Sequence, residues 1–307
     1  MTHRVDVLGI GCAAIDDIIY IDGVPVADGK ARVISQGRDF GGLTATALVA
    51  AARLGAACCF ASRLGNDPGS LAIIRDLRQS GVVVPRRTLS SDARPVRSTV
   101  ISSLGTGARA IYFTNPEVTG AHPEMSEVMV RRARVLVLDG YGFEGSLRAA
   151  RIARGARVPV VADFENADHP DFRQLLALVD HLVLSQPFAE ELTGTADVPE
   201  ALRILWDDSR QVVAITTGGS GCSLITRDVR KVVHVPAHPV EVVETRGCGD
   251  VFHGAYAAAL AFGYPVLGAI RFATVAAGLK AAQFGTRQGL PTRSEVEALL
   301  PESDLLR

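Results

Sequence analysis

Short apolar runs alternate with helical patterns through the middle of the chain, and this alternation limits the fold more than any other feature. Apolar runs occur at 57–61, 135–138, 158–163 and 181–184, and helical patterns cover 68–80, 145–154 and 172–179. Repeated strand and helix alternation predicts a mainly parallel sheet with helices on both faces. We therefore expect a three-layer α/β/α fold in which residues 1–307 form one unit.

Ligands of such sheets bind beyond the carboxyl ends of the strands. Four residues directly follow predicted strands: Gly11, Asp139, Asp163 and Ser185. The sequence therefore predicts that a binding site lies along this edge of the sheet.

Charge and composition favour a small-molecule partner. The chain has 32 Lys and Arg against 33 Asp and Glu, so no basic excess is present to bind nucleic acid or an anionic membrane. It has no apolar run of about 18 residues to span a bilayer, and its N-terminus lacks the apolar segment of a signal peptide. Its five cysteines show no disulfide or zinc spacing. We expect a cytoplasmic protein.

The segment 9–14 matches a loose G-x-G-x-x-A pattern, which is typical of dinucleotide-binding loops when a helix follows. Here residues 16–25 are β-branched and aromatic and end in a turn containing Gly23 and Pro25, which favours a strand. This pattern argues against a nicotinamide cofactor.

The stretch 243–254 combines a glycine-bearing turn, one carboxylate and the start of a long apolar helix. Gly247 and Gly249 allow the backbone to approach a ligand, and the helix start directs unpaired N–H groups and a positive dipole end outwards. Asp250 lies beside this anion hole. It is either a catalytic base or a helix-capping residue, and spacing alone does not decide between them.

This stretch resembles the second signature of the pfkB family of carbohydrate kinases, which includes ribokinase. Six residues match the signature: Thr245, Gly247, Gly249, Asp250, Phe252 and Gly254. The resemblance implies a ribokinase-like fold in which Asp250 takes the proton of a sugar hydroxyl. The amides of Gly247, Cys248 and Gly249 would then stabilise the transferred phosphoryl group. His253 is expected to be a core or supporting residue rather than a metal ligand.

The resemblance also implies Mg-ATP as the phosphoryl donor. Many relatives bind a monovalent cation beside the signature loop, but Glu244 stands here for the usual Asp, so this cation stays open. The family's Asn-x-x-Glu, which organises the magnesium shell, is replaced by Ser185 to Phe188. Asp163 and Glu165 are nearby carboxylates that are either metal-directed or structural, and no metal ligand is assigned.

Sugar binding is implied for the paired glycines Gly41 and Gly42, which otherwise form an ordinary turn before a helix ending near Leu54. Thr46 stands where ribokinases have Asn, and Asp16 aligns with the aspartate that holds sugar hydroxyls. Extended segments at about 16–39 and 97–115 are expected to form a small β lid over the sugar.

Nucleotide binding is implied for the strand–turn–strand segment 212–225, which is not a P-loop because it lacks Gly-Lys-Ser/Thr. Two helices are expected after the signature, at about 251–262 and 266–284. The residues implied in binding ATP are Ser185, Thr216, Gly218, Gly221 and Gly285.

Within the family, the pattern is most similar to the kinases of 6-deoxy-6-sulfofructose. Lys30 and Asn115 match two residues that hold the sulfonate there, but an arginine of those kinases aligns near Tyr141. The loss of that charge makes a neutral ketose or another 6-modified ketose an equal alternative, unless Arg97 or Arg109 supplies it.

The sequence as a whole therefore predicts an ATP-dependent sugar kinase, with a homodimer through the β lids implied by resemblance. The alternatives are a non-catalytic homologue that binds sugar and nucleotide, or a kinase of ribose, nucleosides or 2-keto-3-deoxygluconate.

Overall fold

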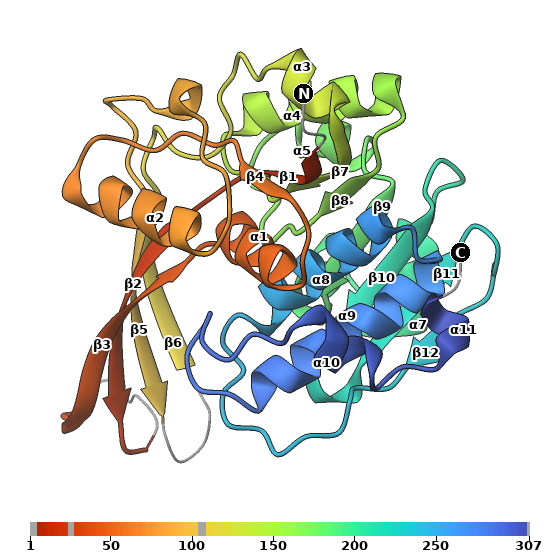
Figure 1. The fold of residues 1–307 in the computed structure, drawn as a ribbon. Helices are drawn as coiled ribbons and strands as arrows, with labels where there is room; N and C mark the ends of the chain where they lie inside the picture. The colour runs from red at the N-terminus through yellow and green to blue at the C-terminus, as the bar shows by residue number, and fades with distance from the viewer. Residues whose placement is uncertain (1–4, 24–27, 104–108, 306–307) are drawn as a thin grey trace.

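An eight-stranded sheet forms the centre of the molecule (Figure 1), in a computed structural model that describes residues 5–23, 28–103 and 109–305. Its strand order is β12-β11-β10-β9-β8-β7-β1-β4, and all pairs from β10 to β4 are parallel. The antiparallel strands β11 and β12 extend one edge. The expected mainly parallel sheet is confirmed. The strands are β1 (Val5–Ile10), β4 (Cys58–Phe60), β7 (Ala133–Leu138), β8 (Val160–Ala162), β9 (His181–Ser185), β10 (Val212–Thr216), β11 (Cys222–Thr226) and β12 (Val233–Val235).

Helices cover both faces of this sheet, which confirms the three-layer architecture (Figure 1). One face carries α1 (Leu43–Arg53), α2 (Pro68–Gln79), α8 (Cys248–Phe262), α9 (Val266–Ala281), α10 (Arg293–Glu297) and α11 (Glu302–Leu305). The other face carries α3 (Glu127–Arg131), α4 (Phe143–Ala156), α5 (Phe172–Leu176), α6 (Gln186–Thr193) and α7 (Val198–Leu205).

Strand β7 shows why the central strands read as continuous apolar runs. Val135 and Val137 pack into the core on the α8 side, whereas Leu136 and Leu138 pack into the core on the α4 side. Successive side chains of a strand point to opposite faces, so a sheet buried on both faces needs apolar residues at every position.

A second, four-stranded sheet extends from the main body (Figure 1). Its order is β3-β2-β5-β6, with β2 and β5 parallel and the outer pairs antiparallel. The strands are β2 (Ala14–Ile21), β3 (Val33–Gly41), β5 (Val96–Ser103) and β6 (Arg109–Thr114). Because β2 begins at Ala14, the G-x-G-x-x-A pattern is followed by a strand, as expected, and not by a helix.

Several boundaries differ from those expected from the sequence. Helix α8 begins at Cys248, three residues early, because Gly247 adopts a left-handed conformation with φ of 72° and starts the helix. Helix α9 ends at Ala281, whose carbonyl oxygen accepts from Val243 and Glu244 instead of continuing the helix. Strand β3 begins only at Val33.

The expected turns around 24–27 and 104–108, and the N-terminal residues 1–4, lie outside the described residues. No helix of the described part is long and apolar enough to span a bilayer. All five cysteines carry free thiols, and four of them are buried.

Candidate active site

Asp250 lies in the first turn of α8, where the glycine turn meets the helix. Gly247 is the N-cap and the helix begins at Cys248, so Asp250 is its third residue; Asp250 is half-buried. Its carboxylate accepts no hydrogen bond from any residue that the structure describes, and it makes no capping contact. A carboxylate at a helix start is usually engaged in capping. The side chain of Asp250 is instead available to a ligand.

Backbone amides beside Asp250 are also unpaired. The N–H of Cys248 donates to the carbonyl oxygen of Thr245 at 3.3 Å. The N–H groups of Gly247, Gly249 and Asp250 have no acceptor within residues 5–23, 28–103 and 109–305. Unpaired amides at the positive end of a helix dipole form an anion-binding site.

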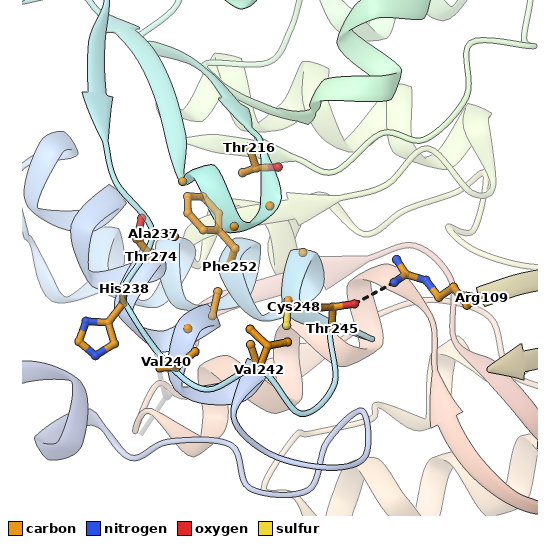
Figure 2. A pocket seen from close by; sticks show the side chains of 17 residues that line it. Arg109, Thr216, Ala237, His238, Val240, Val242, Thr245, Cys248, Phe252 and Thr274 are labelled. Carbon is orange, nitrogen blue, oxygen red and sulfur yellow. Dashed lines mark hydrogen bonds between the residues drawn. The ribbon is translucent and has the colours of Figure 1, made fainter. Parts of the chain in front are cut away.

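A cavity of about 440 Å³ opens beside these amides (Figure 2). This volume falls in the range typical of small-ligand pockets. Three residues implied in nucleotide binding, Thr216, Gly218 and Gly221, line the cavity together with Cys248 and Gly249. Its apolar wall consists of Ala237, Val240, Val242, Phe252, Ala277 and Ala281. The structure thus joins the strand–turn–strand segment and the signature loop around one space.

At two positions that line the cavity, Gly219 and Gly249, the packing of the protein itself does not require glycine. A Cβ atom at Gly219 or at Gly249 would meet no atom within 4 Å, and neither residue has a positive φ. Their missing side chains leave open space where a ligand can approach the backbone.

Ser185 and Gly285 do not line this cavity. The Ser185 hydroxyl caps α6 by accepting from the N–H of Phe188 at 3.4 Å. The N–H of Gly285 donates to Glu244 Oε2 at 2.7 Å. Both residues therefore stabilise the local fold next to the cavity.

Arg109 joins the second sheet to the signature loop. Its Nη1 donates to Thr245 Oγ1 at 3.0 Å, and the side chain lines the cavity (Figure 2). From the sequence, we expected Arg109 to lie on the lid, as one of two arginines that could supply a positive charge for binding the sugar. Its partner in the structure is Thr245, which lines the same cavity as Thr216, Gly218 and Gly221.

Asp16 lies at the other side of the site, on β2. Ser98 donates to Asp16 Oδ1 at 2.5 Å. A Cβ atom at Gly41 would lie 2.1 Å from Asp16 Oδ2, so glycine is required there for close packing. The pKa of Asp16 is raised because the group is buried, although the Ser98 hydrogen bond acts in the opposite direction.

Arg287 was not singled out from the sequence, although Gly285 in the same segment was implied in binding ATP. Its Nη2 donates to the carbonyl oxygen of Gly41 at 3.0 Å, and its Nε donates to Thr46 at 3.4 Å. It also pairs with Asp76, and its charge acts on Asp250. The buried guanidinium thus links the two predicted sugar-binding residues to the neighbourhood of Asp250. These partners are too distant in sequence to give a local signal.

The structure separates Lys30 from Asp16. Strand β3 begins with Val33 paired to Ile21, and Asp16 lies five residues along β2 towards Gly41. At about 3.3 Å per residue, roughly 17 Å of strand lies between these positions. Asn115 follows β6 at the opposite end, because Thr114 pairs with Arg97. Asn115 therefore lies at the same end of the second sheet as Asp16.

Tyr141, where sulfofructose kinases have an arginine, packs on a small apolar cluster. The cluster contains Cys12, Ala14, Val96 and Leu43. Burial raises the pKa of the Tyr141 hydroxyl. This part of the site presents an aromatic side chain and no positive charge.

Asp139 fixes the edge of the sheet on which the site is built. Its buried carboxylate accepts from the N–H of Cys12 at 2.7 Å, from Thr44 Oγ1 at 2.9 Å and from the N–H of Tyr141 at 3.0 Å. A Cβ atom at Gly11 would clash with it at 2.2 Å. Asp139 therefore ties the ends of β1 and β7 to the start of α1.

Carboxyl groups crowd around Asp250. Burial, followed by the charges of Asp163 and Glu165, raises the pKa of Asp250 well above its usual range. The pKa of Asp163 is raised by burial and by Glu165 and Asp139. Carboxylates in close proximity cannot all ionise easily, so they hold protons more strongly.

His253 is buried and lies next to Asp163, one of these acids. Its Nδ1 is 2.9 Å from the carbonyl oxygen of Gly249 and 3.1 Å from Asp163 Oδ2, and its Nε2 is 3.0 Å from the carbonyl oxygen of Val183. Burial lowers the pKa of His253. The histidine therefore connects α8 to β9 and to Asp163, which is a supporting position.

Within the described residues, no three His, Cys, Asp or Glu side chains are grouped so that they could hold a metal ion. Mg²⁺ usually keeps several waters and is bound through one or two carboxylates together with substrate phosphates. Asp163 and Glu165 can supply such a carboxylate. Burial and neighbouring carboxylates raise the pKa of both, and a bound cation would favour their ionised forms.

The fold, the glycine turn at the start of α8 and the cavity beside it are features of a carbohydrate kinase. The model of the pfkB family carbohydrate kinases matches residues 6–293, so the chain belongs to this family. It is 28% identical to ribokinase of Bacillus subtilis, over 95% of this chain and 98% of that one. It is 27% identical to fructokinase-1 of Oryza sativa subsp. japonica, over 96% and 97%.

The structure of Arabidopsis thaliana ribokinase complexed with ribose and ATP has the same fold, with a TM-score of 0.81 and 23% identity. The match covers 97% of this chain and 99% of that one. The ribokinase-like fold expected from the sequence is therefore confirmed.

Proposed function

We propose that this carbohydrate kinase transfers the γ-phosphate of ATP to a hydroxyl of a ketose, with Asp250 as the general base. The observation that carries the proposal is the position of Asp250. Within the described part of the chain its carboxylate accepts no hydrogen bond, and the amides of Gly247 and Gly249 beside it are unpaired. Gly249 lines the cavity of about 440 Å³.

In this mechanism, Asp250 accepts the proton of the attacking sugar hydroxyl. The sugar oxygen forms a bond to the γ-phosphorus, and the bond from that phosphorus to the oxygen bridging to the β-phosphate breaks, which releases ADP. The amides of Gly247 and Gly249 donate to the phosphoryl oxygens as charge shifts towards the bridging oxygen, and the N–H of Cys248 is a weaker contributor because Thr245 engages it. Positioning and charge stabilisation supply most of the rate enhancement in such transfers.

The raised pKa of Asp250 suits this role. A base works best when its pKa lies near the working pH, and a carboxylate of ordinary pKa is a weak proton acceptor. Burial and the charges of Asp163 and Glu165 supply the shift. The charges of Arg287 and of a protonated His253 act in the opposite direction.

ATP would occupy the cavity lined by Thr216, Gly218 and Gly221, with its base on the apolar wall and its phosphates towards Gly249. Mg²⁺, when bound, would neutralise charge on these phosphates, with Asp163 or Glu165 as the protein carboxylate. Arg109 lies where it would contact the phosphates from the second sheet.

The sugar would lie between Asp16 and Asp250, under the second sheet acting as a lid. Gly41, Gly42 and Thr46 border this space, and Arg287 holds Gly41 and Thr46 in place. We favour a neutral ketose over sulfofructose for two reasons. Tyr141 carries no charge. Lys30 precedes Val33, which pairs with β2 five residues away from Asp16.

We further propose a cytoplasmic homodimer. The free cysteines suit a reducing compartment. The outer strands of the second sheet expose large apolar side chains, and such exposed groups indicate a contact surface. They are Val33, Ile34, Ile111, Tyr112 and Phe113.

A test of the function is release of ADP from Mg-ATP by the purified protein with fructose, sulfofructose, ribose, nucleosides, 2-keto-3-deoxygluconate and sugar phosphates. We expect the highest kcat/KM with a ketose. Release with another sugar class would overturn the substrate assignment. Binding of sugar and nucleotide without ADP release from any sugar would overturn the kinase proposal and favour a non-catalytic protein.

A further inference from the structure

Lys280 is a fully buried cation beside the signature loop. It lies in the last turn of α9, with none of its surface exposed. Its Nζ donates to the carbonyl oxygen of Glu244 at 3.1 Å. An ammonium group is costly to bury unless its surroundings favour positive charge.

The groups around Lys280 are mostly negative. The C-terminal end of α9 carries the negative end of the helix dipole. The charges that act on Lys280 come from Cys248, Glu244 and Asp39, which favour its charged form, and from Arg246, which opposes it. Burial lowers the pKa of Lys280 and is the largest of these influences. The end of α9, the carbonyl oxygen of Glu244 and the carboxylates of Glu244 and Asp39 offset part of the cost of burying this cation, which the protein supplies from its own chain.

Lys280 is part of a set of contacts that fixes the loop leading to the anion hole. The N–H groups of Val243 and Glu244 donate to the carbonyl oxygen of Ala281 at 2.8 and 3.0 Å. With the bond from Lys280, three hydrogen bonds hold residues 243–244 against the end of α9. Gly247 follows Glu244 by three residues, so this attachment fixes the position of the unpaired amides and of Asp250.

The oxygens of Glu244 and the carbonyl oxygen of Ala281 are already engaged by groups of the chain itself. Lys280 occupies the carbonyl of Glu244, and two N–H groups occupy that of Ala281. The Glu244 carboxylate is paired with Arg246 and accepts from the N–H of Gly285. Arg246 in turn donates to the hydroxyl of Tyr20 at 2.9 Å. The residues present do not fit the monovalent cation that many family members bind beside this loop.

We propose that Lys280 is a built-in substitute for that ion, so that the protein holds its anion-hole loop without any monovalent metal cation. The proposal rests on the proposed function in one respect, namely that the loop binds the transferred phosphoryl group. Its structural part, that the loop needs the Lys280 charge and no dissolved cation, is independent of the reaction.

The first test is thermal unfolding of the wild-type protein, with and without ADP, in potassium, sodium or tetramethylammonium chloride at equal ionic strength. Tetramethylammonium is too large for a site made for potassium. We expect the same unfolding midpoint and the same stabilisation by ADP in all three salts. A rise specific to potassium or sodium would overturn the proposal, because it would reveal a cation site that Lys280 does not fill.

The second test compares Lys280→Ala with Lys231→Ala, since Lys231 is an exposed lysine before β12. We expect Lys280→Ala to lower the midpoint and to weaken ADP binding about ten- to a hundredfold, the effect of one charged hydrogen bond. Potassium or ammonium should partly restore both properties by entering the vacated space. Lys231→Ala should resemble the wild type in every salt.

A Lys280→Ala protein that matches Lys231→Ala, or that responds to potassium and ammonium no more than the wild type does, would overturn the proposal. If Lys280→Ala fails to fold, the wild-type salt series still decides the question. If no sugar yields ADP, the kinase proposal fails while the unfolding measurements still test Lys280. The two failures are therefore distinguishable.

Discussion

The guanidinium of Arg109 lies 3.0 Å from the hydroxyl of Thr245, and this hydrogen bond connects the second sheet to the loop that carries the unpaired amides. The two residues are far apart in the sequence and come together at the mouth of the cavity (Figure 2). The second sheet therefore contributes Arg109 to the cavity proposed for ATP as well as Asp16 to the space proposed for the sugar.

Replacement of Arg109 should weaken ATP binding more than sugar binding. Arg109→Met removes a charge that lines the cavity, so we expect the KM for ATP to rise about ten- to a hundredfold, while the KM for the sugar changes little. Arg38→Met is a matched control, because Arg38 lies on the same sheet and forms an exposed ion pair with Asp17. Equal effects of the two substitutions in steady-state kinetics would contradict this role.

Adjacent aspartates on β2 should differ sharply in their effect on sugar binding. Asp16 lies against Gly41 and Ser98, whereas Asp17 points to the exposed Arg38. Asp16→Asn should raise the KM for the sugar by about tenfold or more, with the KM for ATP unchanged, because a charged hydrogen-bond acceptor is lost. Asp17→Asn should leave both constants near the wild-type values. A sugar KM unaffected by Asp16→Asn would exclude it as a sugar ligand.

The crowded carboxyl groups should make Asp250 costly for folding at neutral pH. Its pKa is raised in the folded protein, so its contribution is favourable below the pKa of the unfolded chain, about 3.9, and becomes unfavourable as pH rises through the folded value. Asp250→Asn should therefore stabilise the protein at pH 8 relative to the wild type, because the neutral amide is not penalised as a charge by burial or by Asp163 and Glu165. The difference should shrink towards pH 4.

Thermal or denaturant unfolding across this pH range measures the effect, with Asp17→Asn as the control. Equal stability of Asp250→Asn and the wild type at pH 8 would show that the carboxyl groups do not repel one another.

The exposed apolar side chains on the outer strands of the second sheet should control association. Ile111 on β6 and Ile204 on α7 are exposed to similar extents, 51% and 53%. Ile111→Lys should convert a dimer into monomers in analytical ultracentrifugation, since a charge would be buried in the contact. Ile204→Lys should remain dimeric. Monomeric wild-type protein, or a dimer that tolerates Ile111→Lys, would refute the proposed contact.

The overall fold follows from local patterns. Alternating apolar and helical segments predicted the layers, because each strand of a sheet buried on both faces must be apolar throughout, as Val135 to Leu138 shows. The short pieces α6 and α7 were not predicted, and helix ends such as that of α9 depend on contacts from Val243 and Glu244 that no local pattern reveals.

The chemical elements of the site were predictable where one short segment contains them, as with Gly247, Gly249 and Asp250. Contacts between distant segments were not predictable. Arg287 reaches Gly41 and Thr46 across about 240 positions, and Lys280 reaches the carbonyl of Glu244, with nothing in the neighbouring sequence to indicate either partner. Such contacts depend on how helices pack, which periodicity does not specify.

The role of Asp250 is tested most directly by measuring turnover and ATP affinity side by side for the wild type and Asp250→Asn. We expect Asp250→Asn to bind ATP with near wild-type affinity in calorimetry, but to release ADP about 10²–10⁴-fold more slowly with the preferred sugar, because the proton acceptor is lost. The acidic limb of the wild-type pH profile should also disappear. Unchanged turnover in Asp250→Asn would contradict the assignment of Asp250 as the base.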